Sequence, residues 1–189
     1  AYFTESRGRG KGAGAKSVRG TKTMAAQRAI VIAGGAFAGL ALALALRQGL
    51  GPEIPVIVAD PALATRPSRD PRASAIVAAC RRLFETLGVW ETIAEDTQPI
   101  LDMVITDSRL EDAVRPTFLT FSGDVAPGEP FAHMVENRHL IDALTQRAER
   151  EGVELRPLAV SDYASHPEGI SVTFSDGAVV EASLLVAAD

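Results

Sequence analysis

AIVIAGGAFAGLALALAL, residues 29–46, is the stretch that decides the fold. It opens with β-branched residues, passes through Gly34-Gly35 and ends in an Ala/Leu-rich segment. This order predicts a buried strand at 29–33, a glycine turn and a helix at 38–48. The run carries no charge and is nearly as long as a membrane-spanning helix, which needs roughly 20 residues, so a membrane helix is the alternative. The change of residue type along the run favours strand, turn and helix.

Strands and helices continue to alternate after this unit. Gly51-Pro52 ends the helix before a second strand at 55–59. Two short strands joined by a helix make a βαβ unit, which predicts a parallel sheet with a right-handed crossover. A further helix is expected to end near Gly88, because apolar residues recur at helical spacing before it. These residues are Ile76, Ala79, Cys80, Leu83 and Leu87.

The part of the chain from 101 to 136 has a different character. Its β-favouring runs, 103–105 and 118–121, are separated by Pro, Gly and Asp residues, which predicts strands of a second sheet. A helix at 138–151 follows, and Gly152 closes it. The other expected strands lie at 153–155, 159–164, 170–174, 178–182 and 184–188, with a hairpin turn at 175–177.

Composition and charge restrict the classes of function. Of the 189 residues, 47% are hydrophobic, which is enough for a buried core. The net charge is −5 although the segment before Met24 is basic, so the remainder is acidic and a poor candidate for binding nucleic acid. Cys80 is the only cysteine, which excludes an internal disulfide, and we expect it to be unreactive in a helix. No metal site is expected, because the three histidines are not spaced like ligands; they are His133, His139 and His166.

The Gly-rich turn has the spacing of a dinucleotide site. It lies between a strand and a helix, and Asp60 follows about twenty residues later at the end of the next strand. The helix N-terminus offers N–H groups and a positive dipole to a pyrophosphate. Asp60 can accept hydrogen bonds from a ribose diol and would repel a 2′-phosphate. The turn residues are Gly34, Gly35, Ala36, Phe37, Ala38 and Gly39.

Ala36 departs from the usual glycine pattern. It stands where the backbone comes nearest to the pyrophosphate, so its methyl group could push the phosphates outward and weaken binding. A Gly-Gly pair that serves only as a tight turn is the alternative interpretation. The position of Asp60 favours the nucleotide site.

Five segments resemble a known family. Val31–Leu40 resembles the opening of class A flavin monooxygenases. Asp70–Ile76 and Leu87–Trp90 are similar to the ubiquinone-biosynthesis hydroxylase branch, and Met134–Leu140 strengthens the match. Leu184–Asp189 is similar to the strand that leads into the family's Asp-Gly motif, and ends at the Asp. The resemblance covers almost all of the chain after its basic leader.

The resemblance implies roles for residues beside the turn. The turn itself would hold the pyrophosphate of FAD, and Asp60, where the family usually has Glu, would bind the adenosine ribose. Arg72 would reach the flavin side of the cofactor; a solvated loop charge is the alternative. A guanidinium there also suits pyrophosphate oxygens.

Four further residues take roles from the same resemblance. Asn137 and Arg138 open a helix, and would contact the cofactor or merely cap that helix. Val160 would flank the adenine, or serve as an ordinary strand residue. Asp189 would lie near the pyrophosphate and the reduced nicotinamide.

The implied fold is α/β: a Rossmann-like FAD-binding domain, with a parallel sheet and an antiparallel β crossover, plus part of a second, β-sheet substrate domain. Because the chain stops on a core strand, we expect a fragment of a longer protein, inactive alone. The expected divisions are a disordered basic leader at 1–23, the first part of the FAD-binding domain at 24–98, substrate-domain strands at 99–136 and the continued, truncated FAD-binding domain at 137–189.

The resemblance implies an FAD-dependent monooxygenase of ubiquinone biosynthesis. It would use NAD(P)H and O2 to hydroxylate the aromatic ring of a polyprenylated phenol, with the cofactor supplying the chemistry; no catalytic side chain is assigned. The expected location is cytoplasmic, with room for association with the inner membrane surface and with other ubiquinone-biosynthesis proteins. The alternatives are another FAD-dependent oxidoreductase or halogenase, and a non-catalytic nucleotide-binding module.

Overall fold

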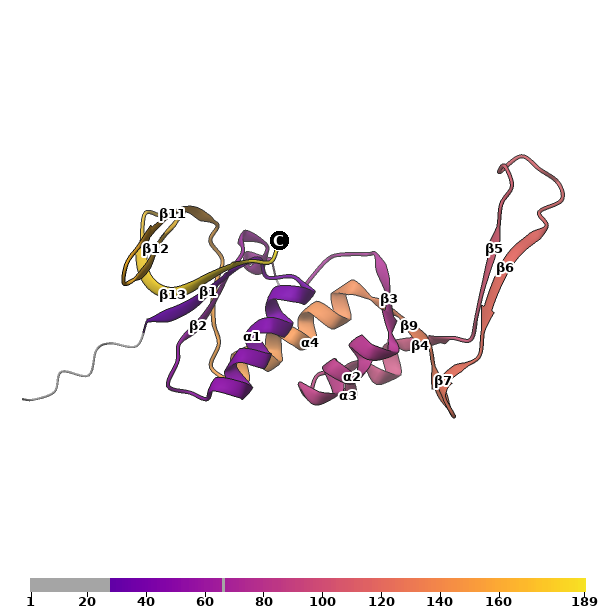
Figure 1. Ribbon diagram of the computed structural model, residues 1–189, viewed down its shortest axis with the longest axis horizontal. Helices are drawn as coiled ribbons and strands as arrows, with labels where there is room; N and C mark the ends of the chain where they lie inside the picture. The colour runs from indigo at the N-terminus through magenta and orange to yellow at the C-terminus, as the bar shows by residue number, and fades with distance from the viewer. Residues whose placement is uncertain (1–27, 66) are drawn as a thin grey trace, which may run out of the picture.

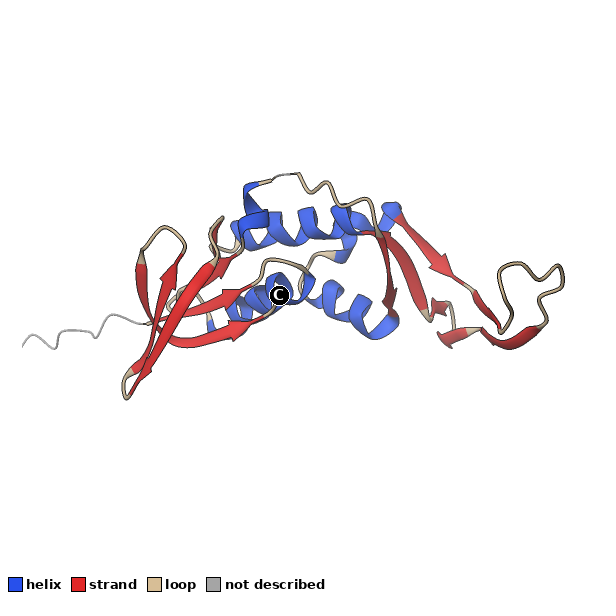
Figure 2. Ribbon diagram, turned by 90° about the horizontal axis from the view of Figure 1, so that it is seen from above, coloured by secondary structure: helices blue, strands red, loops and turns tan. Residues whose placement is uncertain are grey.

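A computed structural model describes residues 28–65 and 67–189, so the leader expected at 1–23 lies outside the described residues. The described chain is elongated. A six-stranded sheet lies at one end, helices lie in the middle, and a two-stranded ribbon projects from the other end (Figures 1 and 2). The fold is mixed α/β.

The first unit has the predicted order. Strand β1 (Ala29–Ala33) leads into helix α1 (Phe37–Leu50), which returns to strand β2 (Val56–Ala59). The two strands pair in parallel, from Ile30 beside Val56 onward, which confirms the predicted βαβ unit. The apolar run at 29–46 is therefore divided between a strand, a turn and a helix. None of the helices in the described part of the chain is long and apolar enough to cross a membrane.

The main sheet has the strand order β10-β2-β1-β13-β12-β11. The first four strands in this order pair in parallel. An antiparallel meander, in which β12 pairs with both β13 and β11, extends the sheet. The strands not yet described are β10 (Glu154–Arg156), β11 (Val160–His166), β12 (Gly169–Phe174) and β13 (Val179–Ala187).

The two strands expected at 178–182 and 184–188 are in fact the single strand β13, so that prediction was wrong. The first part of β13 pairs antiparallel with β12 and its second part pairs in parallel with β1, and Ala182 takes part in both pairings. No Gly, Pro, Asn or Asp interrupts the run. The second part was also expected to be buried, but Leu184 is 48% exposed.

Two helices cover one face of the main sheet. Helix α1 packs beside α4 (Asn137–Arg150), and their apolar side chains form a core with inward residues of β1 and β2. Ile32, Leu44 and Leu140 are completely buried there. Alternation along β1 sends Val31 to the opposite face. A smaller cluster gathers on that face, where the meander curls over the sheet.

The helix predicted before Gly88 is shorter than expected, and it buries a different face. Ile76 belongs to strand β3 (Ala73–Val77), and helix α2 (Ala78–Thr86) begins only after it. Pairing of β3 with β9 places Ile76 in the sheet, so the helix buries Phe84 while Cys80 and Leu83 are exposed. The predicted apolar face was therefore wrong, although Cys80 does lie in a helix. The short helix α3 (Trp90–Ile93) follows.

The middle segment forms the predicted strands, in three separate small sheets. Strand β9 (Ala132–Glu136) pairs with β3 and with β4 (Thr97–Ile100). Strands β5 (Asp102–Thr106) and β6 (Thr117–Ser122) pair only with each other, and we call them the ribbon. Strands β7 (Asp124–Ala126) and β8 (Glu129–Pro130) form a short hairpin, and the 3₁₀ turns are η1 (Pro61–Ala64) and η2 (Ala94–Asp96).

Candidate functional site

Two glycines of the turn are required by the close approach of the backbone. Gly34 has φ = 120°, and a Cβ there would lie 2.5 Å from the carbonyl carbon of Ala188. A Cβ on Gly39 would lie 1.9 Å from the carbonyl oxygen of Gly34. The absence of a side chain at Gly39 therefore lets α1 lie against the turn that follows β1, and its absence at Gly34 lets that turn lie against the main chain that follows β13.

The N-terminus of α1 presents unsatisfied donors. Ala36 is the N-cap, and the first helical hydrogen bond runs from the Leu40 N–H to the Ala36 carbonyl. Residues Phe37 to Gly39 precede this bond, so their N–H groups have no partner within the helix. No side chain caps them. Ala36 has φ = −86° and ψ = −166°, an extended conformation open to any residue, so its methyl group causes no backbone strain.

Asp60, directly after β2, is hydrogen-bonded to this turn. Its carboxylate accepts one hydrogen bond from the Gly35 N–H at 2.7 Å and another from the Ala62 N–H at 2.7 Å. The second bond makes Asp60 the N-cap of η1. A carboxylate has about four acceptor positions, so two remain for a ligand's hydroxyl groups.

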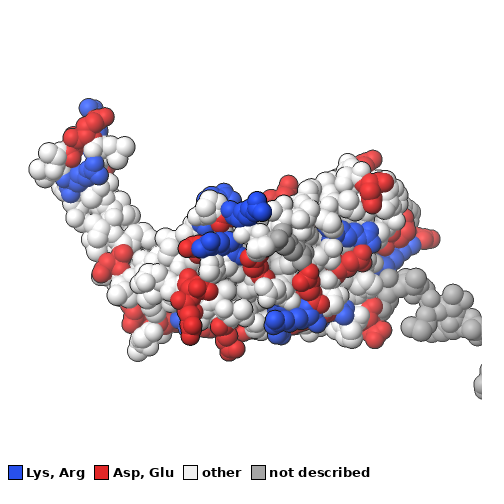
Figure 3. Space-filling model, turned by 180° about the vertical axis from the view of Figure 1, so that it is seen from behind, with Lys and Arg blue, Asp and Glu red and all other residues white. Residues whose placement is uncertain are grey.

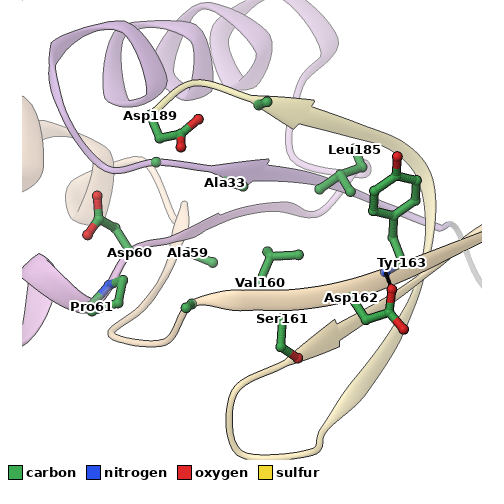
Figure 4. Close-up of a pocket in the computed structure, with 13 residues that line it drawn as sticks. Ala33, Ala59, Asp60, Pro61, Val160, Ser161, Asp162, Tyr163, Leu185 and Asp189 are labelled. Atoms are coloured by element: carbon green, nitrogen blue, oxygen red, sulfur yellow. Dashed lines mark hydrogen bonds between the residues drawn. The ribbon is translucent and has the colours of Figure 1, made fainter.

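A cavity of about 470 Å³ opens at the carboxyl ends of β1 and β2. It brings together four of the predicted residues: Gly34, Asp60, Val160 and Asp189. Figure 4 shows Asp60 and Asp189 at one end of the cavity, and Leu185 and Tyr163 at the other.

Tyr163 and Leu185 were missed by sequence reasoning. Tyr163 lies on the edge strand β11, three residues after Val160, and is 61% exposed. Its single signal in the sequence is an aromatic residue in a short strand, which does not by itself indicate a cavity. Leu185 was expected only as part of a core strand.

Arg72 and Asn137 form a second cluster that does not line this cavity. Arg72 makes two side-chain hydrogen bonds to Asp70, from Nε at 2.9 Å and from Nη2 at 2.8 Å. The amide of Asn137 donates to Asp70 at 2.9 Å and accepts from the Ser74 hydroxyl at 2.7 Å. The hydrogen bonds from Arg72 and Asn137 lower the pKa of Asp70 well below its usual range, and Asp70 in turn raises the pKa of Arg72. Sequence reasoning missed Asp70 and Ser74 as members of a site.

Arg138 lies on the exposed side of α4. Its Nε pairs with Glu136 at 2.6 Å, and its side chain lines a hollow of about 540 Å³ together with Ser68, Asp70 and other loop residues. A smaller hollow of about 110 Å³ contains Gly35, Asp60 and Ser68. Asp60 thus belongs to the cavity and to the smaller hollow, and Ser68 belongs to both hollows. Because they share these residues, the cavity and the two hollows form a chain of depressions that runs from the cavity past the glycine turn to Arg138.

The histidines make separate contacts. His133 is 8% exposed and packs edge-to-face against Trp90, at 5.3 Å between ring centroids. His139 lies 3.0 Å from Asp96, and His166 lies 2.9 Å from Glu181. Within residues 28–65 and 67–189, no group of side chains could hold a metal ion.

Charge is scattered over the surface and forms no extended basic face in the view of Figure 3. Arg, Asp and Glu side chains alternate over the helical part of the molecule. Arginines are mostly matched by carboxylates, as in the Arg82–Glu129 and Arg147–Glu151 pairs.

The chain was compared with known proteins and with solved structures. No family model matches the chain. Ubiquinone hydroxylase UbiL of Rhodospirillum rubrum is 36% identical over 162 residues, which are 85% of this chain and 36% of the relative. The chain therefore spans about a third of the length of this curated relative.

Solved structures share the fold. Diels-Alderase PyrE3, from pyrroindomycin biosynthesis, aligns with a TM-score of 0.67 and 25% identity, over 86% of this chain and 32% of that one. A mutant of 2-methyl-3-hydroxypyridine-5-carboxylic acid oxygenase aligns with a TM-score of 0.63 and 26% identity, over 86% of this chain and 40% of that one.

These similarities confirm the resemblance seen in the sequence: the chain belongs to the monooxygenase class of flavoenzymes. Within that class, over the 162 residues that it shares with the Rhodospirillum rubrum protein, it belongs to the ubiquinone hydroxylase family.

Proposed function

We propose that this part of the chain is a Rossmann-like domain that binds FAD. It serves a monooxygenase that hydroxylates the aromatic ring of a polyprenylated phenol, with NAD(P)H and O2 as co-substrates. One observation carries the proposal: Gly34, Asp60, Val160 and Asp189 line a single cavity beside the free N-terminus of α1. Ligands of open α/β sheets bind at the carboxyl ends of the strands, where this cavity lies.

The cavity fits the adenosine half of FAD. Asp60 has acceptor positions left for the two ribose hydroxyls, and its charge disfavours a 2′-phosphate. The walls formed by Ala33, Val160 and Leu185 are apolar and suit the faces of a purine. The N–H groups at the start of α1 would then face the pyrophosphate.

The chain of depressions suits the rest of an extended cofactor. From Asp60 it passes Ser68 and reaches Arg138, with the Asp70–Arg72 pair beside its far end. FAD supplies the redox chemistry when it is bound, by taking electrons from the nicotinamide and delivering them to O2. The side chains of this chain hold and orient it: Asp60 at the ribose, the α1 N-terminus at the pyrophosphate, and Arg72 and Arg138 toward the flavin.

The test is an equilibrium titration of the chain with FAD and with ADP, followed by fluorescence. Both ligands share the adenosine diphosphate half, so both should bind, and Asp60→Ala should weaken each by at least about tenfold through loss of charge-assisted hydrogen bonds. Arg72→Ala should weaken FAD more than ADP.

Asp162→Asn is the matched control, because Asp162 lines the same cavity and its carboxylate accepts only the Tyr163 N–H among the hydrogen bonds of the described residues. It removes the same charge from the cavity and should leave both affinities within about twofold of the parent. A folded chain that binds neither ligand would contradict the proposal. So would equal losses in Asp60→Ala and Asp162→Asn, since these would indicate only a general effect of charge.

A further inference from the structure

We propose that Asp70 is a positioning residue, which holds the guanidinium of Arg72 in the orientation that receives the cofactor. The inference rests on the proposed function and deepens it. Asp70 itself would not touch the cofactor; it would act through Arg72. The evidence is the set of hydrogen bonds by which one carboxylate joins Arg72, in its own loop, to Asn137 of α4.

The carboxylate of Asp70 is fully engaged. Its Oδ1 accepts from the backbone N–H of Arg72 at 3.0 Å and from Nε of Arg72 at 2.9 Å. Its Oδ2 accepts from Nη2 of Arg72 at 2.8 Å and from the Asn137 amide at 2.9 Å. Two oxygens therefore bind one guanidinium edge, one main-chain group and the first residue of α4. This bidentate geometry fixes the plane of the guanidinium.

Asn137 is itself held in place. It is 7% exposed, its side-chain oxygen accepts from Ser74, and its backbone N–H donates to the Arg72 carbonyl at 2.8 Å. Asp70 is thus anchored directly to Asn137 of α4, and Asn137 is in turn bonded to Ser74 of β3. An anchored carboxylate can orient a long flexible side chain, whereas a mobile one cannot.

Burial differs sharply between the two partners of the pair. The side chain of Asp70 is 17% exposed and that of Arg72 is 80% exposed. The carboxylate lies against the protein and the guanidinium projects outward. Nη1 of Arg72 makes no hydrogen bond with any residue that the structure describes, so that edge is open to a ligand.

This arrangement has a chemical consequence. A guanidinium has five N–H donors, and the pair with Asp70 uses two of them. The other three remain available for phosphate or carbonyl oxygens. An arginine already fixed in its plane loses less conformational freedom on binding than a free one. Asp70 neutralises part of the charge, so its contribution is to geometry and not to long-range attraction.

The alternative is a structural role, in which Asp70 only ties the loop at residues 67–72 to α4. A thermodynamic cycle separates the two roles, since a residue that acts through Arg72 matters only while Arg72 is present. Four proteins are needed: the parent chain, Asp70→Asn, Arg72→Ala and the double variant. FAD affinity is measured by fluorescence titration, and folding by thermal unfolding.

We expect Asp70→Asn to weaken FAD binding about tenfold in the parent and less than about twofold in the Arg72→Ala background. Asp70→Glu keeps the charge but moves it by one methylene, and should weaken binding about as much as Asp70→Asn if geometry is what matters. Should Asp70→Asn fail to fold, the same cycle is made with Asp70→Glu.

Glu129→Gln is the control. Glu129 pairs with Arg82, and its side chain is also 17% exposed, but it lies outside the candidate site. It should leave FAD binding unchanged. Equal weakening by Asp70→Asn in both backgrounds, or none in the parent, would overturn the positioning role while the parent still binds FAD. Absence of FAD binding by the folded parent would instead overturn the proposed function, and this inference with it.

Discussion

The helix-covered sheet and the ribbon use similar residues with opposite results. Leu44 and Leu140, under the sheet, are completely buried. Phe118 and Phe121, on the ribbon, are 73% and 50% exposed. Every residue of β5 and β6 is exposed, although their sequences favour strands as strongly as that of β1. Figure 3 shows the stem of the ribbon nearly free of charge, with charged groups gathered at its tip.

The difference lies in the second layer. Strands β1 and β2 have α1 and α4 against one face, whereas the ribbon has only its own two strands. Pairing of Met103 with Phe121 and of Ile105 with Leu119 makes one face of the ribbon apolar, and these four side chains stay 38–50% exposed. Two-stranded hairpins are marginally stable in water. The stability of this chain therefore resides in the sheet and its helices.

A substitution in the glycine turn at the start of α1 should have the largest effect on stability. Gly39→Ala would place a methyl carbon 1.9 Å from the Gly34 carbonyl oxygen. This oxygen belongs to the backbone, so it cannot move aside as the end of a flexible side chain could. We expect a loss of at least about 4 kcal/mol, enough to prevent stable folding. Circular dichroism and chemical denaturation measure it.

Gly49→Ala is the control for that substitution. Gly49 lies in the same helix, and a Cβ there would meet nothing within 4 Å. Its replacement should leave stability unchanged or raise it by up to about 1 kcal/mol, because alanine favours the helix. A well-folded Gly39→Ala protein would show that the turn can relax, and that its tight geometry is not essential.

A pair of leucine truncations compares the two regions directly. Leu44→Ala should cost about 2–5 kcal/mol, because it opens a cavity in a closed core. Leu119→Ala, on the ribbon, should change stability by no more than about 0.5 kcal/mol, because that side chain is 41% exposed and lacks a second layer. Denaturant midpoints of both variants give the comparison. Equal losses would mean that the ribbon shares in the cooperative core.

The contrast also explains what could be predicted from the sequence. The βαβ unit was predictable because its signals are local: β-branched residues, then Gly34-Gly35, then the Ala/Leu helix. The position of Asp60 beside the glycine turn was predictable as well, because each follows one of two parallel strands and such strands end at the same edge of the sheet. Tyr163 was not predictable, because its place depends on how the meander curls over the sheet.

The Asp70 cluster shows a second limit. Asp70 and Asn137 are 67 residues apart, and their contact depends on β3 pairing antiparallel with β9. That pairing was hidden because Ile76 fits a helical pattern and a strand equally well. The sequence thus identified Arg72 and Asn137 as separate candidates, and only the fold shows the carboxylate that joins them.

The smallest expected effect concerns His133, on β9, between the covered sheet and the ribbon. His133 is buried against Trp90, and its Nδ1 has no hydrogen-bond partner among the described residues. Desolvation by burial lowers its pKa below the ordinary value of 6.5, and the nearby positive charge of Arg81 adds to the shift. The unfolded chain therefore binds this proton at a higher pH than the folded chain does.

The sign follows from that order of protonation. The contribution of His133 to stability is complete above the unfolded pKa of about 6.5, and it is lost as the pH falls from there toward the folded pKa. His133→Phe keeps an aromatic ring against Trp90 and removes the proton. Thermal unfolding at about pH 7.5 and about pH 5.5 should show a smaller fall in stability for this variant than for the parent. The lowered pKa of Asp70 gives a stabilising contribution that is lost only as the pH falls from the ordinary value of 3.8 downward, so it does not interfere between about pH 7.5 and about pH 5.5. Identical pH dependence in the two proteins would mean that the buried ring accepts its proton without cost, and that the layer between sheet and ribbon is open to water.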